Sequence, residues 1–405
     1  MRISEMRARE DLDAIVRTTL ARDFTEQLGR PVTVSAKGPG QRWLVQPLLS
    51  AFYTPQISGA ARRHLRDDFR WSPVPTRVAP QFALGTALAS APGLRLAGRT
   101  GFFVDPPLHG APDLLIMPGN RRIRLFDFDR RVCRVLLKDG FPPRVMETEV
   151  AVRGRGAQGP FPPITQVAPD LSWFEEPLVD GLVLPRLPPW TRAAPLKARA
   201  LTALAAFTRP SRRTVDAAAH LEPLLARVAQ AAAEVTARYG AASAAASASA
   251  PALAALAATP GELTVATTHG DFQPGNILVT RRRNDVLILD WEHSRTRLAD
   301  YDALVLGLSS RAAVGLGARV RAFVSGAAPC AGLGPEAADL AWRRATAAAF
   351  LLEDLCFYLE ESVEVPGSRP SAGLAVLTRE LASFGPSFGD LGGLRAARPK
   401  PRSAS

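Results

Sequence analysis

The chain reads HGDFQPGN at residues 269–276 and, after an apolar and basic stretch, LDWE at residues 289–292. Asp271 stands five residues before Asn276, and Asp290 follows the second apolar run of the segment. Carboxylate and amide oxygens are the hard ligands that Mg²⁺ prefers in proteins. The segment therefore predicts a loop and a hairpin that gather oxygen ligands around a divalent ion.

The segment also predicts how these ligands are brought together. A turn is signalled by the Pro-Gly pair at residues 274–275, and apolar runs at residues 277–279 and 286–289 predict the two strands of a short hairpin. Asn276 then precedes the first strand, and Asp290 follows the second. Because the two ends of a hairpin meet at one edge, we expect these side chains to share a magnesium ion.

Transfer of a γ-phosphoryl group needs an in-line acceptor hydroxyl, a carboxylate that orients it and takes its proton, and divalent ions that hold the phosphates. Few side chains are required for this chemistry. Asp271 is the candidate base, and Asn276 and Asp290 are the candidate metal ligands. The spacing of the three indicates a phosphoryl-transfer site.

Residues 269–271 with Asn276, followed by residues 290–292, resemble the motifs of the aminoglycoside phosphotransferase and choline kinase family, small-molecule relatives of the protein kinases. Gly270, where protein kinases carry an arginine, favours the small-molecule branch. The resemblance implies an α+β, two-lobed, protein-kinase-like fold with a small β-rich N-lobe, a larger and mostly helical C-lobe, and an extra N-terminal region. It also implies ATP and Mg²⁺ as cofactors, and transfer of the γ-phosphoryl group to a hydroxyl of a small molecule of the amino sugar, amino alcohol or sugar class.

By the same resemblance, Asp271 is the catalytic base, Asn276 and Asp290 are metal ligands, and His269 supports the catalytic loop. For His269, a buried and hydrogen-bonded structural role is favoured over a chemical one. Asp302 lies in the segment that leads into the next helix and is expected to brace the catalytic loop.

Upstream, residues 121–128 and 132–138 predict a β-hairpin with a turn at residues 129–131. Gly119 and Asn120 come directly before the first strand and are the predicted phosphate-covering turn. The GxGxxG loop of better-known kinases is absent from this region. Small-molecule kinases of the family that the chain resembles often use a looser loop.

Lys138, at the end of the second strand, is the predicted contact to the α- and β-phosphates. Strand alternation places Leu136 on the same face, where it is expected to lie against the adenine ring. Residues 145–153 have helical composition and offer Glu147 and Glu149 as partners for Lys138, and Glu149 is preferred. The alternatives are an ordinary strand-end lysine and solvated helix charges.

Residues 173–181 resemble the strand and hinge that join the lobes in this family, where backbone groups hydrogen-bond the adenine edge. Glu176 and Val179 bound the predicted hinge. The predicted cofactor-binding set is therefore Lys138, Glu149, Gly119, Asn120, Leu136, Glu176 and Val179.

The predicted organisation is an N-terminal extension at residues 1–105, a kinase-like N-lobe at residues 106–180, a helical C-lobe at residues 181–390 and a basic, disordered tail at residues 391–405. The extension opens with an amphipathic helix at residues 10–28 and continues as mixed strand and loop. It is a candidate to cover the smaller lobe, to bind a partner or to form a dimer contact. The sequence does not decide among these roles, and it does not indicate an oligomeric state.

With 405 residues, 47% of them hydrophobic, the chain has enough apolar material for two or more domains. Its net charge of +12 and pI of 10.6 favour polyanionic partners, but the charge is diffuse and no binding module is recognised, so no nucleic-acid partner is expected. No run approaches the ~18 apolar residues of a membrane span, and residues 1–13 are unlike a secretory segment, so a cytoplasmic location is expected. Three widely spaced cysteines argue against zinc and a disulfide framework.

The acceptor stays open. A helix predicted at residues 335–362 carries four acidic residues, Glu353, Asp354, Glu360 and Glu361. They either line a pocket for a cationic acceptor, as acidic residues do in aminoglycoside and choline kinases, or form a solvated face, and the second is favoured. The alternatives to a small-molecule kinase are a nucleotide-binding pseudokinase or scaffold, and a kinase acting on a cell-envelope glycan or a protein hydroxyl.

Overall fold

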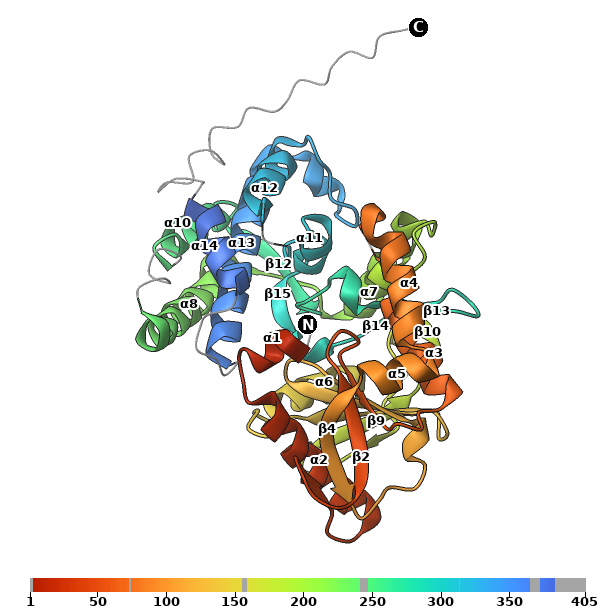
Figure 1. The fold of residues 1–405 in the computed structure, drawn as a ribbon. Coiled ribbons are helices and arrows are strands. Elements are labelled where there is room, and N and C mark those ends of the chain that lie inside the picture. Colours follow the sequence, from red (N-terminus) through yellow and green to blue (C-terminus); the bar gives the residue numbers. More distant parts are fainter. Residues whose placement is uncertain are drawn as a thin grey trace, which may run out of the picture. The chain divides into compact units, whose positions relative to one another are not determined.

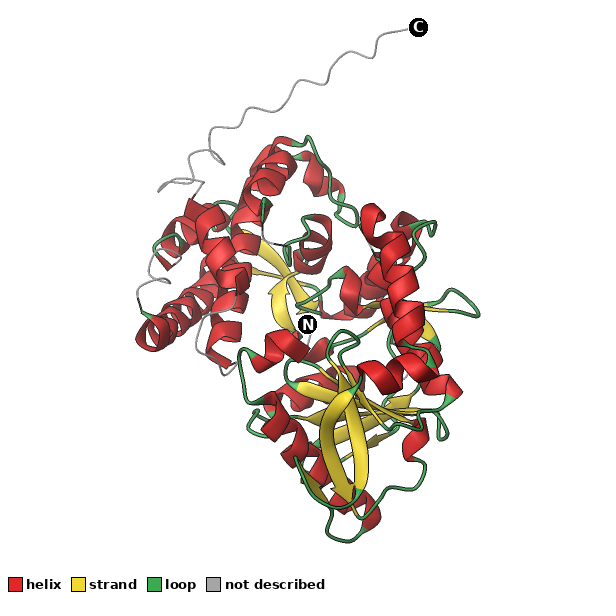
Figure 2. Ribbon diagram, viewed as in Figure 1, coloured by secondary structure: helices red, strands yellow, loops and turns green. Residues whose placement is uncertain are grey.

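The computed structural model describes residues 3–72, 74–154, 159–240, 247–312, 314–364 and 372–382. Contacts divide the chain into two compact units, the first formed by Met1–Ala200 with Pro274–His293 and the second by Leu201–Gln273 with Ser294–Ser405. Each unit combines helices with antiparallel strands, as Figure 2 shows, so the predicted α+β organisation in two parts is confirmed. The predicted lobe boundaries stay predictions, and the predicted tail at residues 391–405 lies outside the described residues.

Within the described residues, the first unit is built on a nine-stranded sheet with the strand order β1-β4-β2-β3-β5-β6-β7-β9-β8. Its strands are β1 (Thr33–Ser35), β2 (Gln41–Gln46), β3 (Ala51–Tyr53), β4 (Arg99–Asp105), β5 (Leu114–Pro118), β6 (Arg122–Asp127), β7 (Val132–Leu137), β8 (Gln166–Val167) and β9 (Trp173–Pro177). The predicted upstream hairpin is confirmed as β6 and β7, in which Asp127 pairs with Val132. β3 joins β5 through the pair Phe52 and Ile116, so the strands of the predicted extension belong to this sheet.

Helices α1 (Ile3–Arg7) and α2 (Leu12–Leu28) cover one face of the sheet, which we call the α2 face. Asp11 begins α2 by accepting the backbone N–H of Ala14 at 3.1 Å, and Gly29 ends it in the left-handed conformation at φ 62°. Figure 1 shows α2 lying along the sheet, and the helix buries its apolar stripe against inward side chains of β2, β4, β6 and β7. The helix predicted from the apolar spacing of this segment is therefore confirmed.

The opposite face, which we call the cavity face, carries α3 (Gly59–Phe69) and α5 (Ala91–Ala97) over β2, β3 and β5. It carries α6 (Arg144–Gly154) over β7 and β9. Helix α4 (Val78–Leu88) packs beside α3. The helix predicted at residues 145–153 is confirmed as α6.

Only strand and loop were predicted for residues 30–105, and this is wrong for α3, α4 and α5. Ser58 begins α3 by accepting the N–H of Ala61 at 3.3 Å. Pro92 stands in the first turn of α5, and Pro80 is the third residue of α4. A proline in the first turn of a helix lacks only an N–H that has no helical partner there, so it is compatible with a helix start.

A second sheet of the first unit has the strand order β10-β13-β14. It consists of β10 (Gly181–Val183), β13 (Ile277–Thr280) and β14 (Val286–Ile288), and the short 3-10 helices η6 (Pro274–Asn276) and η7 (Trp291–His293) flank the β13–β14 hairpin. Ile277 pairs with Ile288 across this hairpin. The hairpin predicted from the two apolar runs is therefore confirmed.

The second unit packs helices around a sheet with the strand order β11-β12-β15. Its elements are β11 (Arg213–Asp216), α8 (Ala217–Tyr239), α10 (Ala250–Ala257), β12 (Glu262–Thr268), β15 (Arg295–Leu298), α11 (Tyr301–Gly307), α12 (Leu316–Ser325), α13 (Leu340–Glu364) and α14 (Ala372–Ala382), and α7 (Ala193–Thr208) spans the boundary between the units. Helix α13 buries side chains around most of its circumference against α8, α10, α12 and α14 (Figure 1). It is therefore the central helix of this unit.

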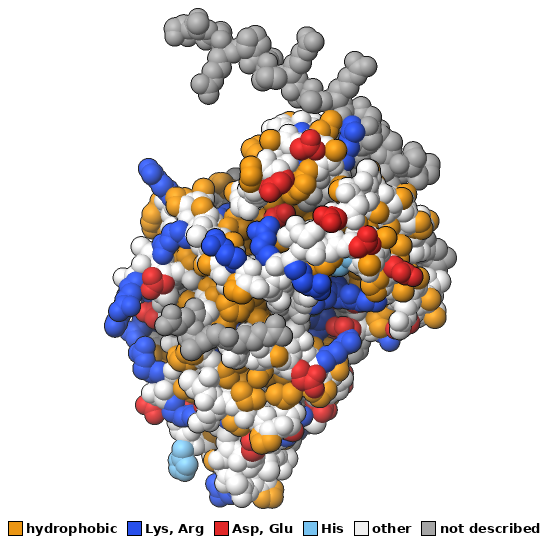
Figure 3. Space-filling model, turned by 180° about the vertical axis from the view of Figure 1, so that it is seen from behind, with side chains coloured by type: hydrophobic (Ala, Val, Ile, Leu, Met, Phe, Trp, Pro, Cys, Tyr) orange, Lys and Arg blue, Asp and Glu red, His pale blue; other side chains and the backbone are white. Residues whose placement is uncertain are grey.

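No helix in the part of the chain that the structure describes is long and apolar enough to cross a bilayer. On the face seen in Figure 3, Lys and Arg side chains are interspersed with acidic and hydrophobic ones. The positive charge of the chain is thus spread over this face, in agreement with the diffuse pattern of charge along the sequence.

Candidate active site

The predicted catalytic loop follows β12 in the second unit, and one carboxylate braces its backbone. Asp302, in the first turn of α11, accepts the N–H of His269 at 2.6 Å and that of Gly270 at 2.9 Å. Gly270 has a φ of +87°, which glycine adopts without strain. Burial raises the pKa of Asp302, and the two N–H bonds act in the opposite direction. The predicted brace is confirmed.

His269 is fully buried, with 0% of its surface exposed. Its Nδ1 accepts the backbone N–H of Asp271 at 3.2 Å, which assigns the proton of a neutral ring to Nε2. The ring lies edge-on to Phe272, with 6.0 Å between the ring centroids. These contacts fit the structural role favoured from the sequence, because the ring fixes the backbone on which Asp271 stands.

The carboxylate of Asp271 is held by an arginine that belongs to no recognised sequence motif. Arg311 Nε donates to Asp271 Oδ1 at 2.6 Å, and Gln273 Nε2 donates to Oδ2 at 2.8 Å. Arg311 also donates to Asp354 at 2.6 Å and to the carbonyl of Gly270 at 2.8 Å. Burial works to lower the pKa of Arg311, but the surrounding carboxylates raise it well above its ordinary value. Arg311 is thus a permanent cation that fixes both the carboxylate and the backbone of the loop.

The acidic residues of α13 have partners within the second unit. Glu353 is buried and accepts a backbone N–H of β15 at 2.9 Å. Asp354 is buried and holds Arg311, while Glu360 accepts from Arg227 Nε at 3.0 Å. The favoured interpretation of a solvated acidic face is therefore wrong for Glu353 and Asp354.

The two predicted metal ligands lie at one edge of the β13–β14 hairpin in the first unit. The carbonyl of Asn276 accepts the N–H of Leu289 at 2.9 Å, which places Asn276 beside the residue that precedes Asp290. Asp290 has a φ of +66°, a left-handed conformation that costs energy in a residue other than glycine. Such strained backbone is held in place by its surroundings and is common at functional sites.

Two arginines of β6 hold the carboxylate of Asp290. Arg122 Nη2 donates to Asp290 Oδ1 at 2.7 Å, and Arg124 forms an ion pair with the same oxygen. Arg122 also pairs with Glu149 and, at 2.9 Å, with Glu292. Burial works against the charged form of Arg122, but the three carboxylates raise its pKa. This buried cluster joins β6, α6 and the segment after β14.

The predicted pair between Lys138 and Glu149 is wrong. Lys138 is buried beneath α1 and α2, where its Nζ pairs with Glu10 and donates to the carbonyl of Asn120 at 3.0 Å. Burial lowers the pKa of Lys138, and Glu10 offsets part of this effect. Leu136 also belongs to the core of the α2 face. Neither side chain is therefore placed to meet a nucleotide on the cavity face.

The prediction for Leu136 and Lys138 is wrong because it assigned these side chains to the wrong face of the sheet. Residues two apart in a strand share a face, so Leu136 and Lys138 do share one, but helices α1 and α2 cover it. Cys133 and Val135 take the opposite side of β7, toward α6. On the neighbouring β6, the two arginines of the Asp290 cluster also point to the cavity face. Their alternation with Ile123 and Leu125 in that strand is the sequence signal for this cluster.

Of the two glutamates considered for the ion pair, the structure buries the preferred one. Glu149 is almost fully buried, whereas Glu147 is exposed. Besides its ion pair with Arg122, Glu149 accepts from Arg153 at 2.9 Å. Glu149 thus has the expected kind of partner, but both cations are arginines.

A cavity of about 1370 Å³ lies on the cavity face of the first unit. Gly119, Glu176 and Val179, which the sequence assigned to the nucleotide site, line it. Asn120 lies in the same turn as Gly119, between β5 and β6. Ligand pockets commonly enclose about 300–1,000 Å³, so this cavity is large enough for a nucleotide.

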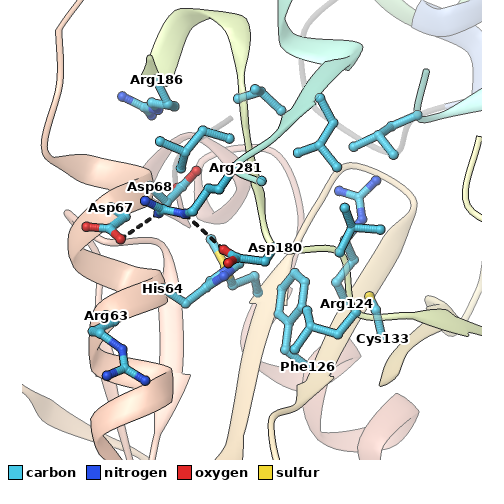
Figure 4. A pocket seen from close by; sticks show the side chains of 18 of the residues that line it. Arg63, His64, Asp67, Asp68, Arg124, Phe126, Cys133, Asp180, Arg186 and Arg281 are labelled. Atoms are coloured by element: carbon cyan, nitrogen blue, oxygen red, sulfur yellow. Dashed lines mark hydrogen bonds and ion pairs between the residues drawn. The ribbon is translucent and has the colours of Figure 1, made fainter. Parts of the chain in front are cut away.

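Further lining residues were not predicted. Cys133 of β7 and Leu278 of β13 form apolar walls, and Leu289 lies next to the Asp290 cluster. Arg124 lines the cavity close to Cys133, as Figure 4 shows. The cavity therefore combines apolar walls for a flat ring with a cation near the predicted metal ligands.

Residues 179–338 match the sequence model of a family described as the phosphotransferase enzyme family, APH. This segment resembles phosphotransferases. It contains the loop of Asp271, the hairpin of Asn276 and Asp290, and the brace Asp302, so the predicted resemblance is confirmed over this range. No curated protein matches the chain.

Solved structures similar to the chain include a choline/ethanolamine kinase family protein from Mesorhizobium loti, with 15% identity, coverage of 70% of this chain and 92% of the other, and a TM-score of 0.44. A choline kinase from Cryptosporidium parvum Iowa II has 9% identity, coverage of 70% and 92%, and a TM-score of 0.45. A thermostable mutant of aminoglycoside phosphotransferase APH(4)-Ia, in a ternary complex with ADP and hygromycin B, has 15% identity, coverage of 67% and 92%, and a TM-score of 0.45. At TM-scores below 0.5, these similarities support no inference about activity.

Replacing Lys138 by alanine is expected to lower the free energy of unfolding by about 3–5 kcal/mol, because the carboxylate of Glu10 would stay buried without its partner. Urea denaturation followed by circular dichroism measures this change. The exposed Lys37→Ala is the control and should change stability by less than about 0.5 kcal/mol. Parental stability of Lys138→Ala would contradict a structural role for this ion pair.

Replacing Asp302 by alanine should cost about 1–3 kcal/mol for each buried N–H that it leaves without an acceptor, those of His269 and Gly270. Asp300→Ala is the matched control two residues earlier, because its ion pair with Arg212 is long, at 4.0 Å. Thermal and urea unfolding compare the two variants. Equal losses of stability in both would argue against a special role of Asp302 in the loop.

Proposed function

We propose that the chain is an ATP-dependent phosphotransferase that moves the γ-phosphoryl group to a hydroxyl of a small molecule. The observation that carries this proposal is the coincidence of the family match at residues 179–338 with a braced loop bearing Asp271 and a hairpin bearing Asn276 and Asp290. Asp271 and Asn276 are five residues apart, so even a fully extended chain keeps their Cα atoms within about 18 Å. The proposed base and the proposed metal ligands are therefore tied closely along the chain.

The cavity is the proposed nucleotide site. In this proposal, the adenine ring lies between the apolar walls of Cys133 and Leu278, with Glu176 and Val179 at the hinge edge and Gly119 at the phosphate turn. The size of the cavity and its mixture of apolar walls with arginines support a ligand that has both a flat ring and phosphates. Adenine rather than guanine follows the family resemblance alone.

The residues at the hairpin edge fit a magnesium ion, because Asn276 and Asp290 offer the amide and carboxylate oxygens that Mg²⁺ prefers. When bound, Mg²⁺ would neutralise the phosphate charge that develops during transfer. Arg124 now shares the Asp290 carboxylate with Arg122 and lines the cavity with 34% of its side chain exposed. We therefore assign to Arg124 the phosphate contact predicted for Lys138, while the buried Arg122 positions Asp290.

Asp271 is the proposed general base, and Arg311 is its positioning residue. A carboxylate held at both oxygens, by Arg311 and Gln273, is oriented before an acceptor hydroxyl arrives. Glu353, Asp354 and Glu360 of α13 hold arginines or a backbone N–H group, so these three lend no support to a cationic acceptor in particular. Amino sugars, amino alcohols and sugars all stay within the proposed acceptor class.

Two further parts of the proposal follow from the sequence. A cytoplasmic location is proposed because no apolar run of the sequence approaches the length of a membrane span. The absence of a nucleic-acid partner is proposed because the positive charge of the chain is diffuse. The pseudokinase alternative is disfavoured because Asp271, Asn276 and Asp290 are all retained and each has an ordered place in its unit.

Turnover of ATP with a panel of amino sugars, amino alcohols and sugars tests the activity. Asp271→Ala is expected to lower kcat by roughly 10² to 10⁴ while nucleotide affinity stays near that of the parent, because only proton transfer loses its base. Asp290→Ala should instead weaken binding of Mg·ATP, and Asp129→Ala, at an exposed position in the β6–β7 turn outside the cavity, is its control. Nucleotide binding without turnover of any acceptor, and without an effect of Asp271→Ala, would favour the pseudokinase.

Arg124→Ala is expected to weaken ATP binding about 10-fold to 100-fold, because a hydrogen bond to a charged group is worth about 1.5–3 kcal/mol. Arg124→Lys should restore part of this affinity, since the charge remains but the planar fork is lost. Isothermal titration with ATP measures both variants against Arg42→Ala, an exposed arginine of β2. Unchanged affinity in Arg124→Ala would remove this residue from the nucleotide site.

A further inference from the structure

Helix α3 precedes the part of the chain that matches the family, and the sequence left its role open. Polar side chains of α3 line the cavity that also contains the predicted hinge, and they include Arg63, His64, Asp67 and Asp68 (Figure 4). The helix therefore forms one wall of the proposed nucleotide site.

The C-terminal end of α3 is tied across the cavity lining by one arginine. Arg281, at the turn between β13 and β14, donates from Nη2 to Asp67 at 2.6 Å and from Nε to Asp180 at 2.9 Å. Its backbone N–H also donates to the carbonyl of Asp180 at 3.0 Å. Figure 4 shows Arg281 between the two carboxylates. We call these side-chain contacts the Arg281 bridge.

The two sides of the Arg281 bridge are attached unequally. Arg281 is joined to Asp180, directly after the predicted hinge, through both its side chain and its backbone. Its link to α3 is a single side-chain ion pair with Asp67, in which 42% of the Arg281 side chain and 13% of the Asp67 side chain are exposed. Exposed ion pairs contribute about 0–1 kcal/mol, so the link to α3 can break and form again readily.

The first half and the middle of α3 are anchored in the core. Ala61 and Leu65 are buried between the helix and the sheet, and His64 packs on Phe126 with 4.7 Å between the ring centroids. The N–H of Ser58 donates to the carbonyl of Pro112, just before β5, at 2.7 Å. At the C-terminal end of α3, Phe69 is only partly buried against the same core and Asp67 is held by a partly exposed ion pair, so this is the end at which the helix can open.

Helix α4 moves with this end of α3 in any such opening. Gln81 of α4 donates from Nε2 to the carbonyl of Phe69 at 2.7 Å, at the last residue of α3. The guanidinium of Arg70 stacks on Phe82 of α4 at 4.0 Å from the ring centroid. The α3–α4 pair is therefore a continuous cover beside the hinge end of the cavity.

We propose that α3 is a lid on the nucleotide cavity, latched by the Arg281 bridge, and that release of Asp67 from Arg281 controls how fast a nucleoside triphosphate or diphosphate is taken up and released. This inference rests on the proposed nucleotide site. It assigns part of the N-terminal extension to nucleotide binding instead of to a partner or a dimer contact. Because the latch is an exposed ion pair, salt should loosen it.

Stopped-flow fluorescence with N-methylanthraniloyl-ADP tests the latch on the full chain. Arg281→Ala and Asp67→Asn should each raise the association and dissociation rate constants about threefold to tenfold, with the Kd changed less than about twofold, because the ion pair holds the closed lid in both free and bound protein. The double variant should behave like either single variant, since both remove the same link. Arg42→Ala, an exposed arginine of β2 that does not line the cavity, is the control and should keep parental rates.

The salt dependence gives a second readout in the same experiment. Dissociation from the parent protein should speed up with added NaCl, whereas dissociation from Arg281→Ala should respond less. Rates in Arg281→Ala and Asp67→Asn that equal those of the parent and of Arg42→Ala, with nucleotide bound normally, would overturn the lid.

Hydrogen–deuterium exchange without nucleotide separates this inference from the proposed function. The C-terminal half of residues 59–69 should exchange faster in Arg281→Ala than in the parent or in Arg42→Ala, because the helix end opens more often. If the parent protein fails to bind the fluorescent nucleotide, the nucleotide site is refuted and the lid loses its ligand. If exchange in α3 is unchanged in Arg281→Ala, the latch itself is refuted, whatever the protein binds.

Discussion

The first unit depends on a buried guanidinium that three carboxylates share. Arg122 of β6 pairs with Glu149 of α6, with Asp290 and with Glu292, so one side chain joins the sheet, a helix on its cavity face and the segment after the β13–β14 hairpin. Each of these charges would be costly if it were buried alone. The cluster therefore fixes the left-handed backbone of Asp290 and, with it, the edge at which the proposed metal ligands lie.

How much the sequence revealed depends on the range of the interactions involved. The β13–β14 hairpin and the brace by Asp302 follow local patterns, namely apolar runs with a Pro-Gly turn and a familiar spacing after the loop, and both were predicted. The face of β7 was not predicted, because a two-residue period defines two equivalent faces and only the packing of α2 decides between them. Arg311 was missed for a related reason: it reaches Asp271 across 40 residues of sequence, and nothing in its own segment marks it.

The N-terminal extension illustrates the same limit in another way. Its strands β1 to β4 continue the sheet that contains the predicted upstream hairpin, and its helices lie on both faces of that sheet. The extension buries Lys138 beneath α1 and α2 and brings α3 to the cavity. One segment thus removes the lysine expected at the nucleotide and supplies a wall of the cavity that the family resemblance did not imply.

The choice of arginine over lysine in this region has a physical consequence. Among the described residues that line the cavity there is no lysine, and the cations nearest the hairpin edge are arginines of β6. An ammonium is a compact point charge, whereas a guanidinium presents several donors in a planar fork and binds two carboxylates at once. Arg122 uses that fork to hold Glu149 and Asp290 together, while the more exposed Arg124 pairs with Asp290 alone. In the proposed site, anchoring and phosphate contact, which a single lysine was predicted to combine, are divided between these two residues two positions apart on one face of a strand.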